Sequence, residues 1–222
     1  MTKRILTINL SPRKHGTSMV MLKRCTEYLE EREHFVQHID LYSHLEKFQT
    51  ILDFVYETDI LVLSGPCYLN TYPGDTVKLL EKLAAHSEIL HGQKLYGIIQ
   101  GGMPYAHTHV SGLNMLKIFA SKADVSYQGG FVMGLGTALD GQPLNKLPLN
   151  SKKVERQFDI FCEHIHNGTM SPNSIYEVAE LKVPRIITWL LAKLMNRELD
   201  KTYAKRGMDA HKPSPYLMDE LR

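Results

Sequence analysis

The segment Ser11–Ser18 carries groups that proteins use to bind a phosphate: hydroxyls, cationic side chains and a glycine in one short loop. A β-rich run, Arg4–Leu10, precedes it, and an amphipathic helical pattern follows it, which Thr17 or Ser18 can cap. The positive end of that helix and its backbone N–H groups would also attract an anion. The segment matches neither GxxxxGK[ST] nor GxGxxG, and taken alone an ordinary turn explains it about as well.

Two further segments carry groups suited to a flat ligand. Gly65–Gly74 includes Tyr68 and Tyr72, so aromatic rings and backbone donors can line a planar molecule. Gly101–Tyr105 begins with two glycines, which permit close approach of the backbone to a ligand. Each segment is a weak signal by itself, but their order along the chain is specific.

The apolar pattern predicts five strands that alternate with five helices. The strands are expected at 4–10, 35–41, 59–65, 95–100 and 126–133. The helices are expected after Ser18, at Glu46–Tyr56, and around the apolar faces Val77–Ala84, Leu113–Ala120 and Val154–Ile165. Polar residues interrupt the second strand, as suits an edge position, whereas the four apolar residues Ile60–Leu63 suit a strand buried on both faces.

This alternation predicts an α/β fold, a three-layer sandwich with helices on both faces of a parallel sheet. The units are too few for a TIM barrel, which needs eight. Ligands of open α/β sheets bind outside the carboxyl ends of the strands. The three ligand segments all follow predicted strands, so we expect them to meet at that edge.

The chain resembles the flavodoxin-like NADPH-dependent FMN reductase family. The family's G-S-P-R-x-x-G-x-[ST] loop is matched at Ser11–Ser18, with Asn9-Leu10 where many relatives have a glycine. The matches further along the chain are Pro66-Cys67-Tyr68 for the P-x-Y segment, Pro73-Gly74 for the Pro-Gly that follows it, and Gly101-Gly102 after strand four. Leu69 and Asn70 stand where many members have an aromatic residue and a glycine. The resemblance covers roughly Thr2–Asn167 and implies the strand order 2-1-3-4-5.

The resemblance implies FMN as the cofactor and NADPH or NADH as the reductant. The residues that would hold the phosphate are Ser11, Arg13, Lys14, Gly16, Thr17 and Ser18. Those that would flank the flavin ring are Pro66, Cys67, Tyr68, Leu69 and Asn70, with Gly101, Gly102 and Tyr105 at its pyrimidine edge. Tyr105 and His107 would contact the substrate. No residue is assigned a catalytic role, because the flavin carries the chemistry.

The implied activity is an NAD(P)H oxidoreductase that passes a hydride through bound FMN to a small acceptor. The acceptor could be a quinone, a nitro- or azo-aromatic compound, a flavin or a metal centre. Two alternatives stay open: a flavodoxin-like electron carrier and a flavin-free binding scaffold. Such carriers are usually strongly acidic, whereas this chain has a net charge of +2.

Composition points to a globular protein of the cytoplasm. Hydrophobic residues make up 43% and charged residues 23%, as in ordinary folded domains. The small net charge gives no electrostatic reason to expect nucleic acid or a membrane as the partner. No segment matches a signal peptide, and the apolar run Ile186–Leu191 is far too short to span a bilayer. Three widely spaced cysteines suit a reducing compartment.

We expect no metal site. His107 and His109, like His164 and His166, are spaced i, i+2, which on a helix points them apart, so solvated positions explain them better than metal ligation. Cys67 is interpreted as a packed small side chain rather than a redox thiol.

The chain is divided into a flavin-binding domain, 1–167, and a helical extension, 168–222. In the extension Ser171–Asn173 reads as a linker, and Val183-Pro184 opens a helix with apolar and basic positions. We expect this helix to pack on the domain or on the second subunit of a homodimer, although a membrane-surface helix would share its pattern. The tail Pro213–Tyr216 could then cover a neighbouring flavin.

Overall fold

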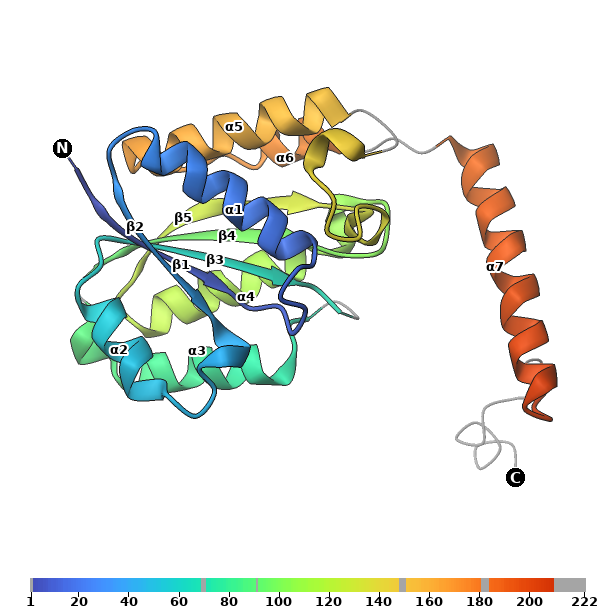
Figure 1. Cartoon of the computed structure of the whole chain (residues 1–222), viewed down its shortest axis with the longest axis horizontal. Helices are drawn as coiled ribbons and strands as arrows, with labels where there is room; N and C mark the ends of the chain where they lie inside the picture. The colour runs from blue at the N-terminus through green and yellow to red at the C-terminus, as the bar shows by residue number, and fades with distance from the viewer. Residues whose placement is uncertain (1, 69–70, 91, 148–150, 181–183, 210–222) are drawn as a thin grey trace. The chain divides into compact units, whose positions relative to one another are not determined.

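The sheet that the sequence predicts is present in full. The structure is a computed structural model that describes residues 2–68, 71–90, 92–147, 151–180 and 184–209. Its five strands are all parallel in the order β2-β1-β3-β4-β5 (Figure 1). They are β1 (Arg4–Asn9), β2 (Phe35–Asp40), β3 (Ile60–Pro66), β4 (Lys94–Gln100) and β5 (Ser126–Met133). Both the fold class and the strand order are therefore confirmed.

Helices cover both faces of the sheet, which makes three layers. The five predicted helices are α1 (Thr17–Glu30), α2 (Phe48–Tyr56), α3 (Gly74–Ala85), α4 (Val110–Lys122) and α5 (Ser151–Asn167). Figure 1 shows α1 and α5 on one face, and α2, α3 and α4 on the other. The central strand β3 is buried along its whole length, whereas the edge strand β2 keeps a partly exposed pattern, as predicted.

A short helix that the sequence analysis missed, α6 (Ser174–Ala179), packs against α5 and β5. The segment before it was predicted to be a linker, but it lies along the outer edge of β5, where Ser171 N–H donates to Gln128 O at 2.8 Å. Contacts divide the chain into the units Met1–Leu181 and Lys182–Arg222, so this segment belongs to the first unit. The boundary predicted at residue 167 marks the end of α5.

The second unit contains the predicted helix, α7 (Arg185–Lys205), which begins after Pro184. Its first turns expose large apolar side chains, namely Ile186, Ile187, Trp189, Leu190, Leu194 and Met195. None of the helices in the described ranges combines the length and the apolar character that a bilayer crossing requires. The predicted tail Pro213–Tyr216 lies outside the described residues.

A pair of histidines joins α5 to the amino end of the sheet. Lys3 N–H donates to His34 Nδ1 at 3.1 Å, and His34 Nε2 lies 2.9 Å from His166 Nδ1. Because His34 Nδ1 accepts, neutral His34 carries its proton on Nε2 and donates it to His166. Lys3 Nζ also donates to the backbone carbonyl of His166. A proton added to either accepting nitrogen would break one of these bonds.

This pair predicts a pH-dependent stability. Burial, and then the charges of His166 and Lys3, lower the pKa of His34. In the unfolded chain His34 takes up a proton near pH 6.5. The contribution of neutral His34 to the free energy of unfolding is therefore full above about that pH, and it is lost as the pH falls toward the lower pKa of the folded state. His34→Asn keeps an acceptor but cannot titrate. We expect its urea midpoint to fall less than that of the wild type between about pH 7.5 and pH 5.5. Equal losses would contradict this account.

Candidate functional site

The loops at the carboxyl ends of β1, β4 and β5 are hydrogen-bonded to one another. The Thr17 hydroxyl donates to Gly136 O at 2.6 Å, and Gly136 N–H donates to Gly101 O at 2.8 Å. Gly101 N–H in turn donates to Met133 O at 3.2 Å. The loop after β3 joins this edge through Cys67 N–H, which donates to Gln100 O at 2.8 Å. The expected meeting of the ligand segments is therefore present.

The loop between β1 and α1 is shaped by side chains at its own start. Asn9 Oδ1 accepts from Ser11 N–H at 3.1 Å, and Ser11 Oγ accepts from Arg13 N–H at 3.1 Å. Asn9 is held from the other side, because its Nδ2 donates to Asp40 Oδ1 at 2.8 Å. Asn9 therefore organises the start of this loop.

The expectation that Thr17 or Ser18 caps α1 is wrong. Gly16 is the N-cap residue and makes no side-chain cap. Thr17 and Ser18 are both buried; the first donates to Gly136 O, and Ser18 Oγ accepts from Gln100 Nε2 at 3.2 Å. These hydroxyls bind protein groups contributed by other loops. Gly16 offers no side-chain acceptor to the first turn of α1, where its carbonyl oxygen accepts from the N–H groups of Met19 and Val20.

Cations lie on the exposed side of the same loop. The Arg13 side chain is 73% exposed, and its ion pair with Asp140 is long, at 3.5 Å. Lys14 and His15 are also exposed. An exposed pair of this kind contributes little to stability, so Arg13 can move to an incoming anion at small cost. The geometry of the loop fits a phosphate bound by backbone N–H groups and mobile cations.

The loop after β3 carries one exposed ring, that of Tyr68, and one buried ring, that of Tyr72. Pro66 ends β3 and is buried, Cys67 is buried, and Tyr68 is 48% exposed. Tyr68 and Thr71 exchange two backbone hydrogen bonds, at 2.7 and 2.9 Å. The predicted residues Leu69 and Asn70 lie outside the described residues. The prediction that Cys67 is a packed side chain is confirmed, with Ser111 Oγ 3.6 Å from its sulfur.

The loop after β4 contributes an exposed face at Gly102 and a ring pair. Gly101 is buried and Gly102 is exposed. Tyr105 and His107 stack with ring centroids 5.7 Å apart and planes 17° from parallel. The residue that follows α6 also holds this loop, because Glu180 Oε1 accepts from Ala106 N–H at 2.9 Å. Sequence reasoning missed Glu180, because it lies beyond the predicted domain boundary.

The expectation that His109 is a solvated residue is wrong. Its side chain is buried next to Gly101, and its Nε2 lies 3.1 Å from Met103 O. The i, i+2 argument assumed that His107 and His109 share one helix, but His107 lies in a short 3₁₀ turn and His109 caps α4. In the described part of the chain, no three His, Cys, Asp or Glu side chains gather closely enough to hold a metal ion.

The segment after β5 was not predicted to contribute to the site. Gly136 bridges Thr17 and Gly101, Asp140 pairs with Arg13, and a Cβ on Gly141 would stand 2.2 Å from His15 O. The only sequence signal was its richness in glycine, which also suits an ordinary insertion. The segment after β5 therefore contacts both the β1–α1 loop and the loop after β4.

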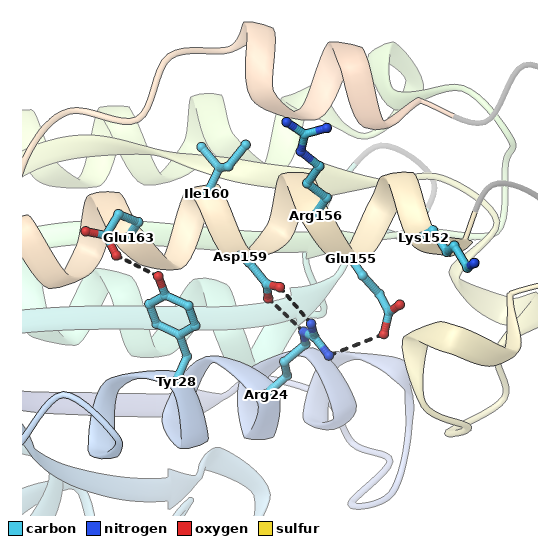
Figure 2. Close-up of a pocket in the computed structure, with 8 residues that line it drawn as sticks. All are labelled: Arg24, Tyr28, Lys152, Glu155, Arg156, Asp159, Ile160 and Glu163. Carbon is cyan, nitrogen blue, oxygen red and sulfur yellow. Dashed lines mark hydrogen bonds and ion pairs between the residues drawn. The ribbon is translucent and has the colours of Figure 1, made fainter.

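A groove of about 530 Å³ lies elsewhere, between α1 and α5. Figure 2 shows that Arg24 is paired with two carboxylates of this groove: it binds Asp159 at 2.8 and 2.9 Å and Glu155 at 3.3 Å. The Tyr28 hydroxyl donates to Glu163 at 2.6 Å. Burial, and then this hydrogen bond, raise the pKa of Tyr28 to about 12, so it stays a donor. These contacts anchor α1, whose amino end starts at the candidate site, to α5.

Comparison with solved structures supports the fold. An apo NADH:FMN oxidoreductase superposes with a TM-score of 0.60 at 19% identity, covering 79% of this chain and 94% of that one. An azoreductase from Bacillus anthracis strain Sterne gives 0.53 at 12%, covering 76% and 100%. General stress protein 14 from Treponema denticola, in complex with FMN, gives 0.51 at 14%, covering 75% and 98%. No family model and no curated protein matches the chain. The chain has the flavodoxin-like fold.

Adjacent glycines provide a matched test of the packing at this edge. A Cβ on Gly101 would lie 2.1 Å from the His109 ring, whereas one on Gly102 would lie 3.5 Å from Thr137. We expect Gly101→Ala to lower the free energy of unfolding by about 1–3 kcal/mol through overpacking. Gly102→Ala should change it by less than about 0.5 kcal/mol. Urea unfolding of the two variants measures both values, and equal effects would refute the close packing around Gly101.

Proposed function

We propose that the protein is an FMN-dependent NAD(P)H oxidoreductase that reduces a small acceptor. The observation that carries the proposal is the junction of the loops after β1, β4 and β5, at the edge where ligands of this fold bind. Solved structures of the same fold named NADH:FMN oxidoreductase, azoreductase and flavone reductase support it. When bound, FMN would supply the hydride chemistry.

For the phosphate, the loop geometry favours some predicted residues over others. The hydroxyls of Thr17 and Ser18 are engaged with protein groups, so these residues would contribute their backbone N–H groups at the start of α1. Ser11 Oγ, Arg13 and Lys14 would supply hydrogen bonds and positive charge, and Gly16 would leave room beside them. The fit therefore depends more on the helix terminus and on cations than on hydroxyl groups.

For the flavin ring, Pro66, Cys67 and Tyr68 would flank one side, with Gly101 and Gly102 at the pyrimidine edge. Tyr68 and Met103 expose large apolar surface at this edge, and the stacked Tyr105 and His107 lie in the loop that follows. Such a surface suits a flat aromatic acceptor, such as a quinone or an azo compound. Leu69 and Asn70 are assigned to the ring by the sequence resemblance.

The setting of the enzyme belongs to the same proposal. We place it in the cytoplasm as a homodimer that acts on small molecules, without nucleic acid or membrane partners, and with NADPH or NADH as donor. The apolar side chains on the first turns of α7 are the surface that we assign to the second subunit, since a helix with such side chains usually packs against a partner surface.

The direct test is the visible spectrum of the purified protein after FMN is added and the sample is desalted. We expect retained flavin bands, followed by their bleaching with NADPH or NADH and turnover with a quinone or azo dye. Retained FMN without NAD(P)H oxidation would favour the electron carrier. A colourless protein that fails to hold FMN would favour the flavin-free scaffold.

Riboflavin, which lacks the phosphate, isolates the role of the β1–α1 loop. We expect Arg13→Ala to weaken FMN binding by about tenfold and riboflavin binding by less than about twofold, since only FMN presents the anion. Flavin fluorescence titration measures both constants. Arg4→Ala, which removes an exposed arginine at the opposite edge of the sheet, is the control and should leave both unchanged. A parallel loss for both flavins in Arg13→Ala would contradict phosphate binding by Arg13.

A further inference from the structure

His109 is a buried histidine with one nitrogen bonded and one unpaired. Only 3% of the residue is exposed, and its Nε2 lies 3.1 Å from Met103 O. Because a carbonyl oxygen only accepts, Nε2 carries the proton, and Nδ1 of the neutral ring is an acceptor. Nδ1 is buried and finds no hydrogen-bond partner among the residues the structure describes.

The same ring supports the backbone at both ends of the exposed Gly102. It occupies the space beside Gly101, where a Cβ would stand 2.1–2.5 Å from three of its ring atoms. At the other end, Met103 O accepts from His109 Nε2 and from Leu135 N–H, at 3.1 and 2.9 Å. Two donors occupy both lone pairs of that carbonyl and fix its direction.

Burial alone does not account for a histidine at this position. An apolar side chain could fill the space without leaving a buried acceptor unpaired, which costs free energy in the folded protein. The histidine adds a donor to Met103 O, and that bond helps to fix the loop that carries the exposed Gly102. A cost to the apoprotein that shapes a ligand loop is typical of a functional position.

We propose that His109 is a positioning residue for the flavin edge: its Nε2–H and its ring hold Gly101–Met103 in one conformation before the ligand arrives. The inference rests on the proposed function, because FMN is the ligand that Gly102 would face. His109 acts through the backbone and does not itself touch the reacting atoms. A fixed loop loses less conformational freedom on binding, so its benefit appears in affinity.

The test compares substitutions that keep or remove the donor. The amide nitrogen of glutamine reaches the position of Nε2, whereas leucine offers no donor and asparagine is too short. We expect His109→Leu and His109→Asn to weaken FMN binding by about tenfold, and His109→Gln to stay within about threefold of the wild type. Fluorescence titration gives the dissociation constants. The midpoint potential of bound flavin should also shift in the variants that lack the donor, because the loop at the pyrimidine edge has moved.

His34→Leu is the matched control, because it removes a buried, hydrogen-bonded histidine at the amino edge of the sheet. It should lower the melting temperature without changing FMN affinity or potential. If His109→Leu and His109→Asn behave like this control, His109 is only structural and the inference is overturned. Failure of His109→Gln to restore binding also overturns it. If the wild type binds no FMN, the proposed function fails, and this inference falls with it.

Discussion

The backbone of Gly136 is the connection on which the candidate site depends. Its carbonyl accepts from the Thr17 hydroxyl and its N–H donates to Gly101 O, so this one residue joins the loops after β1 and β4. The joint leaves no room for a side chain, since a Cβ on Gly136 would stand 2.1 Å from Gln100 Oε1. Gln100 in turn binds Ser18. The start of α1 is therefore positioned by residues at the end of β4 and in the segment after β5.

This joint decides which chemical groups remain for a ligand. The hydroxyls of Thr17 and Ser18, which the sequence resemblance would assign to the phosphate, hold loops together instead, and the cations Arg13 and Lys14 are left exposed. A helix terminus provides fixed donors, whereas exposed cations adapt their positions. In the candidate site, fixed donors at the start of α1 would bind an anion, and the exposed cations of the same loop would attract it from a distance.

The sequence predicts well where local pattern and burial agree. The continuous apolar run of β3 specifies a central strand, and the interrupted run of β2 specifies an edge. The interpretation was wrong or incomplete where distant contacts decide. The Thr17 hydroxyl finds a carbonyl 119 residues away instead of capping its own helix, and His109 turns inward against Gly101. The six-residue α6 is too short to produce a periodic signal, yet the residue after it reaches the site.

The segment that follows α5 also determines where a shorter version of the protein could end. It covers the outer edge of β5 through Ser171 and holds the loop after β4 through Glu180. A fragment that stops at Asn167, where the sequence resemblance stops, would expose the backbone of an edge strand and release that loop together. Uncovered strand edges pair with other chains. Self-association of such a fragment would therefore result from the uncovered edge of β5 and would not describe the assembly of the intact protein.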